Sequence, residues 1–427
     1  MQNILRHISA LIRALRFDGA DPQGLKALGR SDWNKLLFFS DRMHLALPLF
    51  RIHGGDLPDW VQARLAQNLA DNTERFEHIK FIYSEIAQRL RHMALDHLVL
   101  KGFSQCPAFI EEPRYRMQSD LDLFSPADNI FRVRDALSAL GYEPMLGLHP
   151  PGAEHLPPMM RKTKWMWNGN SYDPKMPLAV ELHFSFWNDV TTGLHPSRLD
   201  QFWVRRNEHQ VANFSFPSLS KVDSLAYSAL HVFHHLQIGG LVASHVYELA
   251  YFLHHNAKDS NFWKQWHELH DAPLRKIQAV CFRLASEWFA CRLSEEVQKE
   301  IDLLPPGVEP WFDQFANSPL NSMVRPNKDP LWLHLSLVSS WGNKLSVLRH
   351  SLFPTRTLRL GSAKSGSAQS LIRFVVHLFS RLTYHLRILI PTLWHGIRWW
   401  WSTKRLGRGG VAFLAAFLCC NFAMFIG

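Results

Sequence analysis

Two acidic side chains spaced two residues apart, Asp120 and Asp122, have the arrangement of a candidate cation site. They belong to the segment Ser119-Asp120-Leu121-Asp122-Leu123, in which polar and apolar residues alternate. Side chains along a β-strand point alternately to its two faces, so both carboxylates share one face and the two leucines share the other. Like charges this close raise each other's energy, and a divalent cation or a proton should compensate them. The pattern therefore predicts half of a cation site.

A third carboxylate, Glu181, lies in a later segment with the same alternation, and His183 shares its face. Upstream, the apolar run 98–100 leads directly into Lys101 and Gly102, which predicts a buried strand followed by a loop large enough for a phosphate. Acids on two neighbouring strands beside such a loop are what metal-assisted phosphoryl or nucleotidyl transfer requires. In that chemistry two Mg²⁺ ions about 3.5–4 Å apart clamp the attacking and the leaving oxygen.

In this order, the motifs resemble those of a poorly characterised bacterial branch of the nucleotidyltransferases related to DNA polymerase β. That branch has a hydrophobic strand, Leu-Lys-Gly, a helix, an arginine shortly before Asp-Leu-Asp-Leu, and later an acid-Leu-His strand. The matching residues here are Leu100-Lys101-Gly102, Arg116, Asp120 to Leu123, and Glu181-Leu182-His183. The resemblance covers roughly residues 90–260. The wider superfamily has Gly-Gly or Gly-Ser after its first strand, whereas this chain has Gly102-Phe103-Ser104.

The resemblance implies an α+β fold, with a small mixed sheet flanked by helical regions. It also implies an enzyme that uses Mg²⁺ or Mn²⁺ to move a nucleotidyl group from an NTP such as ATP to a hydroxyl or phosphate acceptor. The expected catalytic residues and metal ligands are Asp120, Asp122 and Glu181. The residues expected to bind the nucleotide are Lys101, Gly102, Ser104 and Arg116. His183 is expected to orient Glu181, to contact the acceptor, or to be an ordinary strand histidine.

Other interpretations of these residues stay open. Paired acids are common by chance, and Asp120 and Asp122 are also compatible with solvated strand ends or with an ion pair to Arg116. The whole chain could accordingly be a membrane-tethered binding or scaffold protein that keeps the fold without the chemistry. His231, His234 and His235 have a spacing that could present imidazoles to a metal, but there is no His-Glu-x-x-His arrangement and the chain has 24 histidines. A structural or substrate-lining role is favoured over a zinc site.

The charge of the chain is concentrated near its C-terminus. The net charge is +10, yet 12 of the 47 Lys and Arg residues and none of the 37 Asp and Glu residues follow position 329. Residues 1–329 therefore carry 35 basic and 37 acidic side chains, a balance that gives no indication of a dedicated nucleic-acid groove. A basic tail rich in tryptophan indicates anionic lipid or another polyanion as a partner. Five cysteines without Cys-x-x-Cys spacing indicate a reducing compartment, and no N-terminal export signal is expected.

The hydrophobic periodicity and the positions of Gly and Pro residues predict that the chain has four parts. These are a helical region at 1–95, the nucleotidyltransferase core at 96–218, a helical domain at 219–360, and a linker with a basic and hydrophobic tail at 361–427. Helices are expected at 32–51, 58–72, 73–92, 103–110, 127–140, 221–238 and 241–254. Strands are expected at 98–100, 120–124, 142–145, 164–167, 178–186 and 210–216.

The C-terminal tail has a sequence pattern that indicates membrane association. A basic amphipathic stretch around residues 373–385 is followed by Trp399-Trp400-Trp401 and by the uncharged segment 411–427, whose 17 residues reach the lower limit for spanning a bilayer. Tryptophan and basic residues are typical of membrane interfaces. We expect a cytoplasmic protein attached to the inner face of the membrane, with the tail spanning the bilayer or lying on it. The alternative is a hydrophobic helix that docks on the body or on a second subunit.

Overall fold

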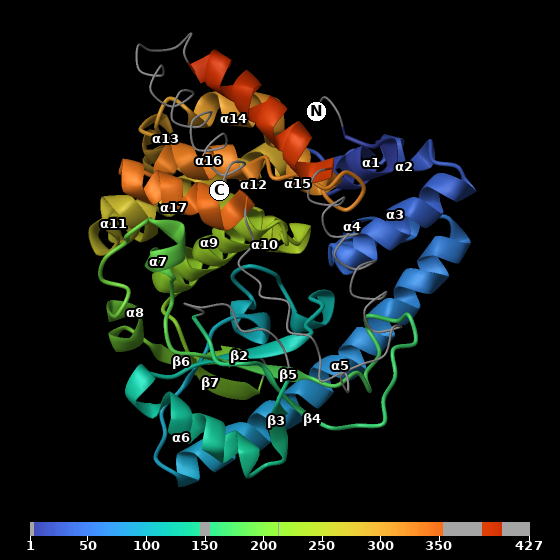
Figure 1. Cartoon of the computed structure of the whole chain (residues 1–427). Coiled ribbons are helices and arrows are strands. Elements are labelled where there is room, and N and C mark those ends of the chain that lie inside the picture. Colours follow the sequence, from blue (N-terminus) through green and yellow to red (C-terminus); the bar gives the residue numbers. More distant parts are fainter. Residues whose placement is uncertain (1–3, 146–153, 212, 353–386, 404–427) are drawn as a thin grey trace, which may run out of the picture. The chain divides into compact units, whose positions relative to one another are not determined.

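The computed structural model describes residues 4–145, 154–211, 213–352 and 387–403 (Figure 1). The chain divides into two compact units, Met1–Leu303 and Leu304–Gly427. The described residues form a mostly helical α+β structure with one mixed sheet, as the sequence predicts. The finer four-part division stays a prediction.

The described part of the first unit contains a seven-stranded sheet in the order β3-β4-β5-β2-β1-β7-β6. The strands are β1 (Leu98–Val99), β2 (Asp120–Phe124), β3 (Tyr142–Pro144), β4 (Met159–Arg161), β5 (Ala179–His183), β6 (Asn207–Val211) and β7 (Phe214–Ser218). The neighbours β2 and β5 run parallel, and their register pairs Asp122 with Glu181. Strand β1 is antiparallel to β2 and parallel to β7. The two predicted acidic strands are therefore adjacent.

The alternation in β2 and β5 separates a hydrophobic face from an acidic face. Leu121, Leu123, Val180 and Leu182 are buried in a core that also contains residues of helices α5 (Asp59–His92) and α6 (Ala127–Ser138). Figure 1 shows α5 and α6 on one side of the sheet and helices α9 (Lys221–Ile238) and α10 (Ala243–Asn256) on the other. Because neighbouring side chains on a strand alternate, burying the leucines turns the acids toward α9 and α10.

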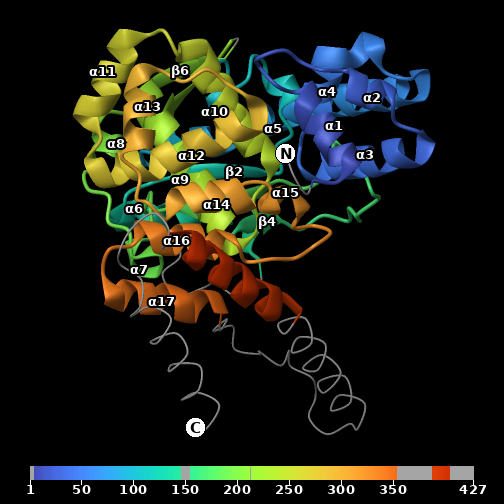
Figure 2. The same cartoon turned by 90° about the horizontal axis from the view of Figure 1, so that it is seen from above.

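The remaining described helices of the first unit are α1 (Arg6–Ala14), α2 (Gln23–Lys26), α3 (Arg30–Arg42), α4 (Ala46–His53), α7 (Asp189–Thr192), α8 (Gln201–Val204), α11 (Ser260–Leu269), α12 (Ala272–Phe289) and α13 (Glu295–Asp302). Figure 2 shows α1 to α4 grouped beside α5. Polar side chains begin several helices, because they accept a hydrogen bond from a backbone N–H of the first turn. Ser220 does so for α9, Asp259 for α11, Asp271 for α12 and Ser294 for α13.

Several boundaries differ from those expected. The two helices predicted at 58–72 and 73–92 are one, α5, since no glycine or proline interrupts it. The helix predicted at 32–51 is divided into α3 and α4, and His44 between them has a left-handed φ of 54°. The helix predicted at 103–110 is only a short 3-10 helix, Gly102–Gln105. Pro107 follows it and has no N–H to donate to a longer helix.

Two strand predictions were also wrong in position. Residues 164–167 are not in a strand, and the strand lies at β4 instead. The single strand predicted at 210–216 is the hairpin of β6 and β7.

The described part of the second unit contains α14 (Val308–Phe315), α15 (Ser318–Asn321), α16 (Pro330–Leu337), α17 (Trp341–Leu352) and a helix at residues 387–403. The last helix is fixed on its unit by Trp399, whose indole donates to Gly307 O at 2.7 Å and stacks on Trp332 with ring centroids 5.9 Å apart. Among the described residues, no helix is long and apolar enough to cross a bilayer. The predicted linker, the basic stretch 373–385 and the apolar segment 411–427 lie outside them.

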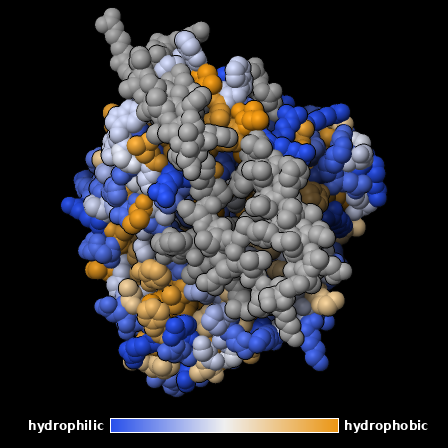
Figure 3. Space-filling view, in the orientation of Figure 1, coloured by the Kyte–Doolittle hydropathy of each residue, from blue (hydrophilic) through white to orange (hydrophobic). Residues whose placement is uncertain are grey.

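Over the described residues visible in Figure 3, hydrophilic side chains are interspersed with smaller hydrophobic patches. The large apolar side chains are mostly inside, including five tryptophans that are almost wholly buried, Trp263, Trp266, Trp288, Trp311 and Trp332. The exposed tryptophans are therefore exceptions that call for an explanation.

Candidate active site

A pocket of about 400 Å³ in the first unit collects most of the residues that the sequence singled out. The acids Asp120, Asp122 and Glu181 line it from β2 and β5. Other parts of its wall come from α9 and α10, which contribute His231, His234, His235 and His245. The acidic face of the sheet therefore opens into a cavity large enough for part of a nucleotide or a sugar.

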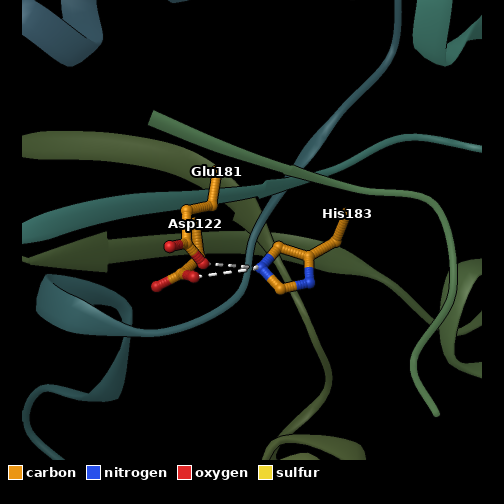
Figure 4. Close-up of side chains that lie close together, drawn as sticks. All are labelled: Asp122, Glu181 and His183. Atoms are coloured by element: carbon orange, nitrogen blue, oxygen red, sulfur yellow. Dashed lines mark hydrogen bonds and ion pairs between the residues drawn. The ribbon is translucent and has the colours of Figure 1, made fainter. Parts of the chain in front are cut away.

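Asp122, Glu181 and His183 form the group that could hold a metal ion among the described residues (Figure 4). One ligand atom from each lies within 4.8 Å of the others. The imidazole Nε2 of His183 is 3.0 Å from Asp122 Oδ1 and 3.7 Å from Glu181 Oε2. Parallel pairing of β2 with β5 places the two acids side by side, and His183 follows two residues later on the same face. The carboxylate oxygens are suitable ligands for a hard divalent cation.

Lys101 adds a positive charge to this group. Its Nζ lies 3.1 Å from Asp122 Oδ1 and 3.4 Å from His231 Nδ1. The side chain is almost fully buried, and its position follows from β1, which pairs with β2 and ends just before it. Although burial lowers the pKa of Lys101, the charges of Asp122 and Asp120 outweigh it and hold that pKa above its usual range. The lysine is therefore charged and lies between the acids and the wall from α9.

The two aspartates of β2 differ in their electrostatics. Burial raises the pKa of Asp122, but the charge of Lys101 and the hydrogen bond from His183 outweigh it and hold the pKa well below its usual range. Burial, together with the charge of Asp122, raises the pKa of Asp120 to about 6. Asp122 is thus a fixed anion, whereas Asp120 is the acid that a nearby cation would stabilise most.

Gly102 and Ser104, two of the residues expected to bind nucleotide, are buried and do not line the pocket. Ser104 Oγ donates to Lys101 O at 3.1 Å. The side chain of Gln118 covers the loop: its Oε1 accepts from the Phe103 N–H at 3.2 Å, and its Nε2 donates to Asp120 O at 2.7 Å. A Cβ on Gly102 would lie 2.3 Å from Gln118 Nε2, and the glycine has a φ of +71°. Nucleotide binding by these two residues stays a prediction.

Arg116 lines the pocket but is held by an acid that the sequence analysis did not identify. Its Nε lies 2.9 Å from Glu248 Oε1 on α10, and both side chains are buried. Burial lowers the pKa of Arg116, but the charge of Glu248 outweighs it and the pKa is raised. Asp120 and Asp122 are therefore not the main partners of Arg116, in contrast to the ion pair that the sequence left open.

Two further pocket residues, Gln118 and His245, were missed, and so was Glu248, which holds Arg116 without lining the pocket. Gln118 lies two residues before Asp120, the first residue of β2, and this spacing in sequence was a signal that was available. Glu248 and His245 lie on α10, 132 and 129 positions after Arg116, and nothing local predicts that α10 packs here. The paired histidines of α9, by contrast, line the pocket. Their position is compatible with the structural or substrate-lining role that the sequence favoured over a zinc site.

Comparison with known proteins agrees with this geometry. A family model described as an uncharacterised nucleotidyltransferase matches residues 29–290, which is more than half of the chain. The matched region contains the sheet, the acidic group and the helices that line the pocket. The chain matches no curated protein and no solved structure.

Proposed function

The chain belongs to this family of uncharacterised nucleotidyltransferases, and from that premise we propose that it transfers a nucleotidyl group from an NTP to a hydroxyl or phosphate acceptor with Mg²⁺ or Mn²⁺. The observation that carries the proposal is the in-register pair Asp122 and Glu181 at the pocket, with Asp120 on the same strand face. Three carboxylates around one lysine leave a local excess of negative charge. A divalent cation would relieve it, as the raised pKa of Asp120 indicates.

The donor set fits a hard cation. Oxygen ligands from Asp120, Asp122 and Glu181 match the preference of Mg²⁺ for carboxylates. His183 would then be a positioning residue, because its Nε2–H donates to Asp122 Oδ1 and fixes the carboxylate. Bound at these acids, the metal would lower the pKa of the acceptor hydroxyl and neutralise charge on the phosphates.

The reaction forms a bond between the acceptor oxygen and the α-phosphorus and breaks the bond to the pyrophosphate, which leaves. The acceptor gives up its proton. In this proposal Lys101, which is charged and lines the pocket, contacts a phosphate oxygen. In the same proposal Arg116 contacts phosphate through the guanidinium that Glu248 holds in position.

The test is Mg²⁺-dependent NTP turnover by the purified full chain, with a cell extract as the source of acceptor and mass spectrometry to identify the product. Asp122→Asn removes a charged metal ligand at nearly constant volume, so we expect a loss of turnover of at least about a hundredfold in a folded protein. Asp120→Asn should behave in the same way. The matched control, Asp128→Asn, changes an exposed aspartate of α6. Turnover of Asp122→Asn at the rate of the control would refute the metal site.

A catalytically silent scaffold is the second candidate, and one observation favours it. Lys101 and His183 both contact Asp122 Oδ1, so this carboxylate is already compensated without a metal. Calorimetric titration with Mg²⁺ in the presence of an NTP analogue separates the two: an enzyme binds both, whereas a silent scaffold takes up neither at the acidic group.

We propose in addition that the second unit attaches the protein to the inner, cytoplasmic face of a membrane. Four residues of the helix at 387–403, Ile390, Trp394, Ile397 and Trp401, are each more than a third exposed and recur at helical spacing; we call them the apolar stripe. Arg387 and Arg398 lie on the same helix, and no acidic residue follows Asp329. An apolar stripe with basic flanks is typical of helices that lie in the interface of an anionic bilayer.

A further inference from the structure

Three histidines from two helices border the pocket together with the acidic group. His231 and His235 lie on α9 and His245 on α10, and we call them the histidine wall. The ring centroid of His231 is 4.3 Å from that of His235 and 4.7 Å from that of His245. Lys101 connects the wall to the acids, since its Nζ contacts both His231 Nδ1 and Asp122 Oδ1.

The rings of the wall line the pocket, and each carries two nitrogen atoms. A lysine ammonium can only donate, so His231 Nδ1 accepts from Lys101 and the proton of the neutral ring resides on Nε2. His235 Nδ1 and His245 Nδ1 have almost no accessible surface; His235 also has a backbone contact with Gly240, and His245 Nδ1 has no hydrogen-bond partner among the described residues. Nε2 is therefore the nitrogen of each ring that remains for a ligand in the pocket.

The wall is not arranged as a second metal site. Among the described residues, the group whose ligand atoms lie within 4.8 Å of one another is Asp122, Glu181 and His183, and it includes none of the three histidines of the wall. The three rings are therefore not arranged to hold an ion together.

The rings are uncharged at neutral pH. Burial, helped by the charge of Lys101, lowers the pKa of His235 to about 4 and holds that of His231 well below its usual range. Burial and the neighbouring His235 do the same to His245. Each neutral imidazole offers one donor and one acceptor, which is what a hydroxyl group requires.

The rest of the pocket favours the same kind of ligand. Its four carboxylates, Asp120, Asp122, Glu154 and Glu181, outnumber its two cations, Lys101 and Arg116, and Arg116 is already paired with Glu248, so the lining disfavours an additional anion. Phe186 and Trp187 line it as well, and aromatic faces pack against the C–H groups of a sugar ring.

We propose that the histidine wall binds the acceptor of the transfer reaction, and that this acceptor is an uncharged polyhydroxylated molecule such as a sugar or a cyclitol. The inference rests on the proposed nucleotidyl transfer. One hydroxyl attacks the α-phosphorus while neighbouring hydroxyls exchange hydrogen bonds with His235 and His245.

Imidazole NMR of the full chain with isotope-labelled histidine tests the proposal. In the first arm, α,β-methylene-ATP and Mg²⁺ are titrated, which tests the proposed function alone. In the second, myo-inositol, methyl glucoside and inorganic phosphate are added separately to the loaded protein. We expect one of the two hydroxylated probes to shift the nitrogens of His231, His235 and His245, with the rings remaining neutral. Phosphate should leave them unchanged.

Variants assign the signals and give a second readout. His245→Leu and His235→Leu should each weaken binding of the hydroxylated probe by about tenfold, because each loses a hydrogen bond to a buried partner. The affinity for the nucleotide analogue should stay unchanged. His245→Gln keeps a donor and an acceptor and should recover most of the binding. The matched control is His78→Leu, an exposed histidine of α5 that does not line the pocket.

The outcomes separate the two proposals. If the analogue binds but neither hydroxylated probe shifts the wall, the acceptor inference is wrong while the proposed function stands. If phosphate shifts the rings to the imidazolium form, the acceptor is anionic and the inference is also wrong. If the analogue fails to bind while a hydroxylated probe shifts the wall, the proposed function fails and the polyol site remains.

Discussion

Arg116 and Glu248 are a buried ion pair between two segments that are distant in sequence. Arg116 lies four residues before Asp120, the first residue of β2, and Glu248 lies on α10 with its side chain only 4% exposed. Even beside Arg116, burial keeps the pKa of Glu248 raised. Taking both charges out of water costs nearly as much as their attraction returns, so the pair is better suited to orienting the guanidinium than to stabilising the fold.

Removing one partner of this pair should therefore cost far more than removing both. We expect Glu248→Leu to lower the free energy of unfolding by about 3–5 kcal/mol, because it leaves Arg116 buried and unpaired. The double variant Arg116→Met with Glu248→Leu should recover most of that loss. Urea denaturation of the three proteins measures it. Equal losses in the single and the double variant would contradict this account. A weaker affinity for α,β-methylene-ATP in the refolded double variant would support the phosphate contact proposed for Arg116.

The elements that could be predicted from sequence are those whose signal is local. Three examples are the alternation in β2 and β5, the Ser220 cap of α9 and the glycine break before α10. Each of these signals lies within a few residues of the strand or helix boundary that it determines. Which strands become neighbours depends on packing across the chain. For that reason the sequence could not predict three contacts: the hairpin of β6 and β7, the packing of Gln118 over the Gly102 loop, and the pairing of Glu248 with Arg116. The positions of the acids were thus predictable, whereas the contacts made by Gln118 and Glu248 were not.

The contact between α5 and His97, the residue before β1, should make the stability of the fold depend on pH. Tyr83 of α5 and His97 share a hydrogen bond, with Oη 2.9 Å from Nε2, and burial lowers the pKa of His97 to about 4 from 6.5. Burial lowers that of His44 in the same way. Above pH 6.5 these histidines are neutral in both the folded and the unfolded chain, so they do not change the free energy of unfolding. Below it, the unfolded chain binds protons that the folded protein excludes.

The free energy of unfolding should therefore fall by about 1.4 kcal/mol per pH unit for each such histidine between its unfolded and its folded pKa. For His97 that interval runs from 6.5 to about 4. His97→Asn keeps a donor and an acceptor for Tyr83 but does not ionise, so its stability should fall less steeply over this range. Urea denaturation at intervals between about pH 7 and about pH 4.5 measures the difference. Parallel curves for the variant and the unchanged protein would show that His97 does not contribute.

At the scale of the whole molecule, the proposed chemistry and the proposed membrane attachment belong to different units. The pocket and its acids lie in Met1–Leu303, whose counts of acidic and basic residues are nearly balanced, whereas the acid-free, strongly basic stretch belongs to Leu304–Gly427. The two exposed tryptophans of the apolar stripe stand out because Trp399 on the same helix is buried against Gly307 and Trp332. One face of that helix thus holds it to its own unit, and the proposed attachment uses the other.

This division predicts how the protein distributes between membrane and solution. The full chain should sediment with vesicles containing anionic lipid, more weakly at high salt, since each Lys or Arg near the surface adds about 1 kcal/mol that salt screens. Trp394→Ser with Trp401→Ser should reduce binding by about tenfold or more through lost apolar burial, and removal of residues 362–427 should abolish it. Trp167→Ser, which changes an exposed tryptophan of the first unit, is the matched control. If the full chain and the truncated protein both stay in the supernatant at low salt, the tail instead belongs to a core or to an interface between copies, and the apolar stripe is covered by protein.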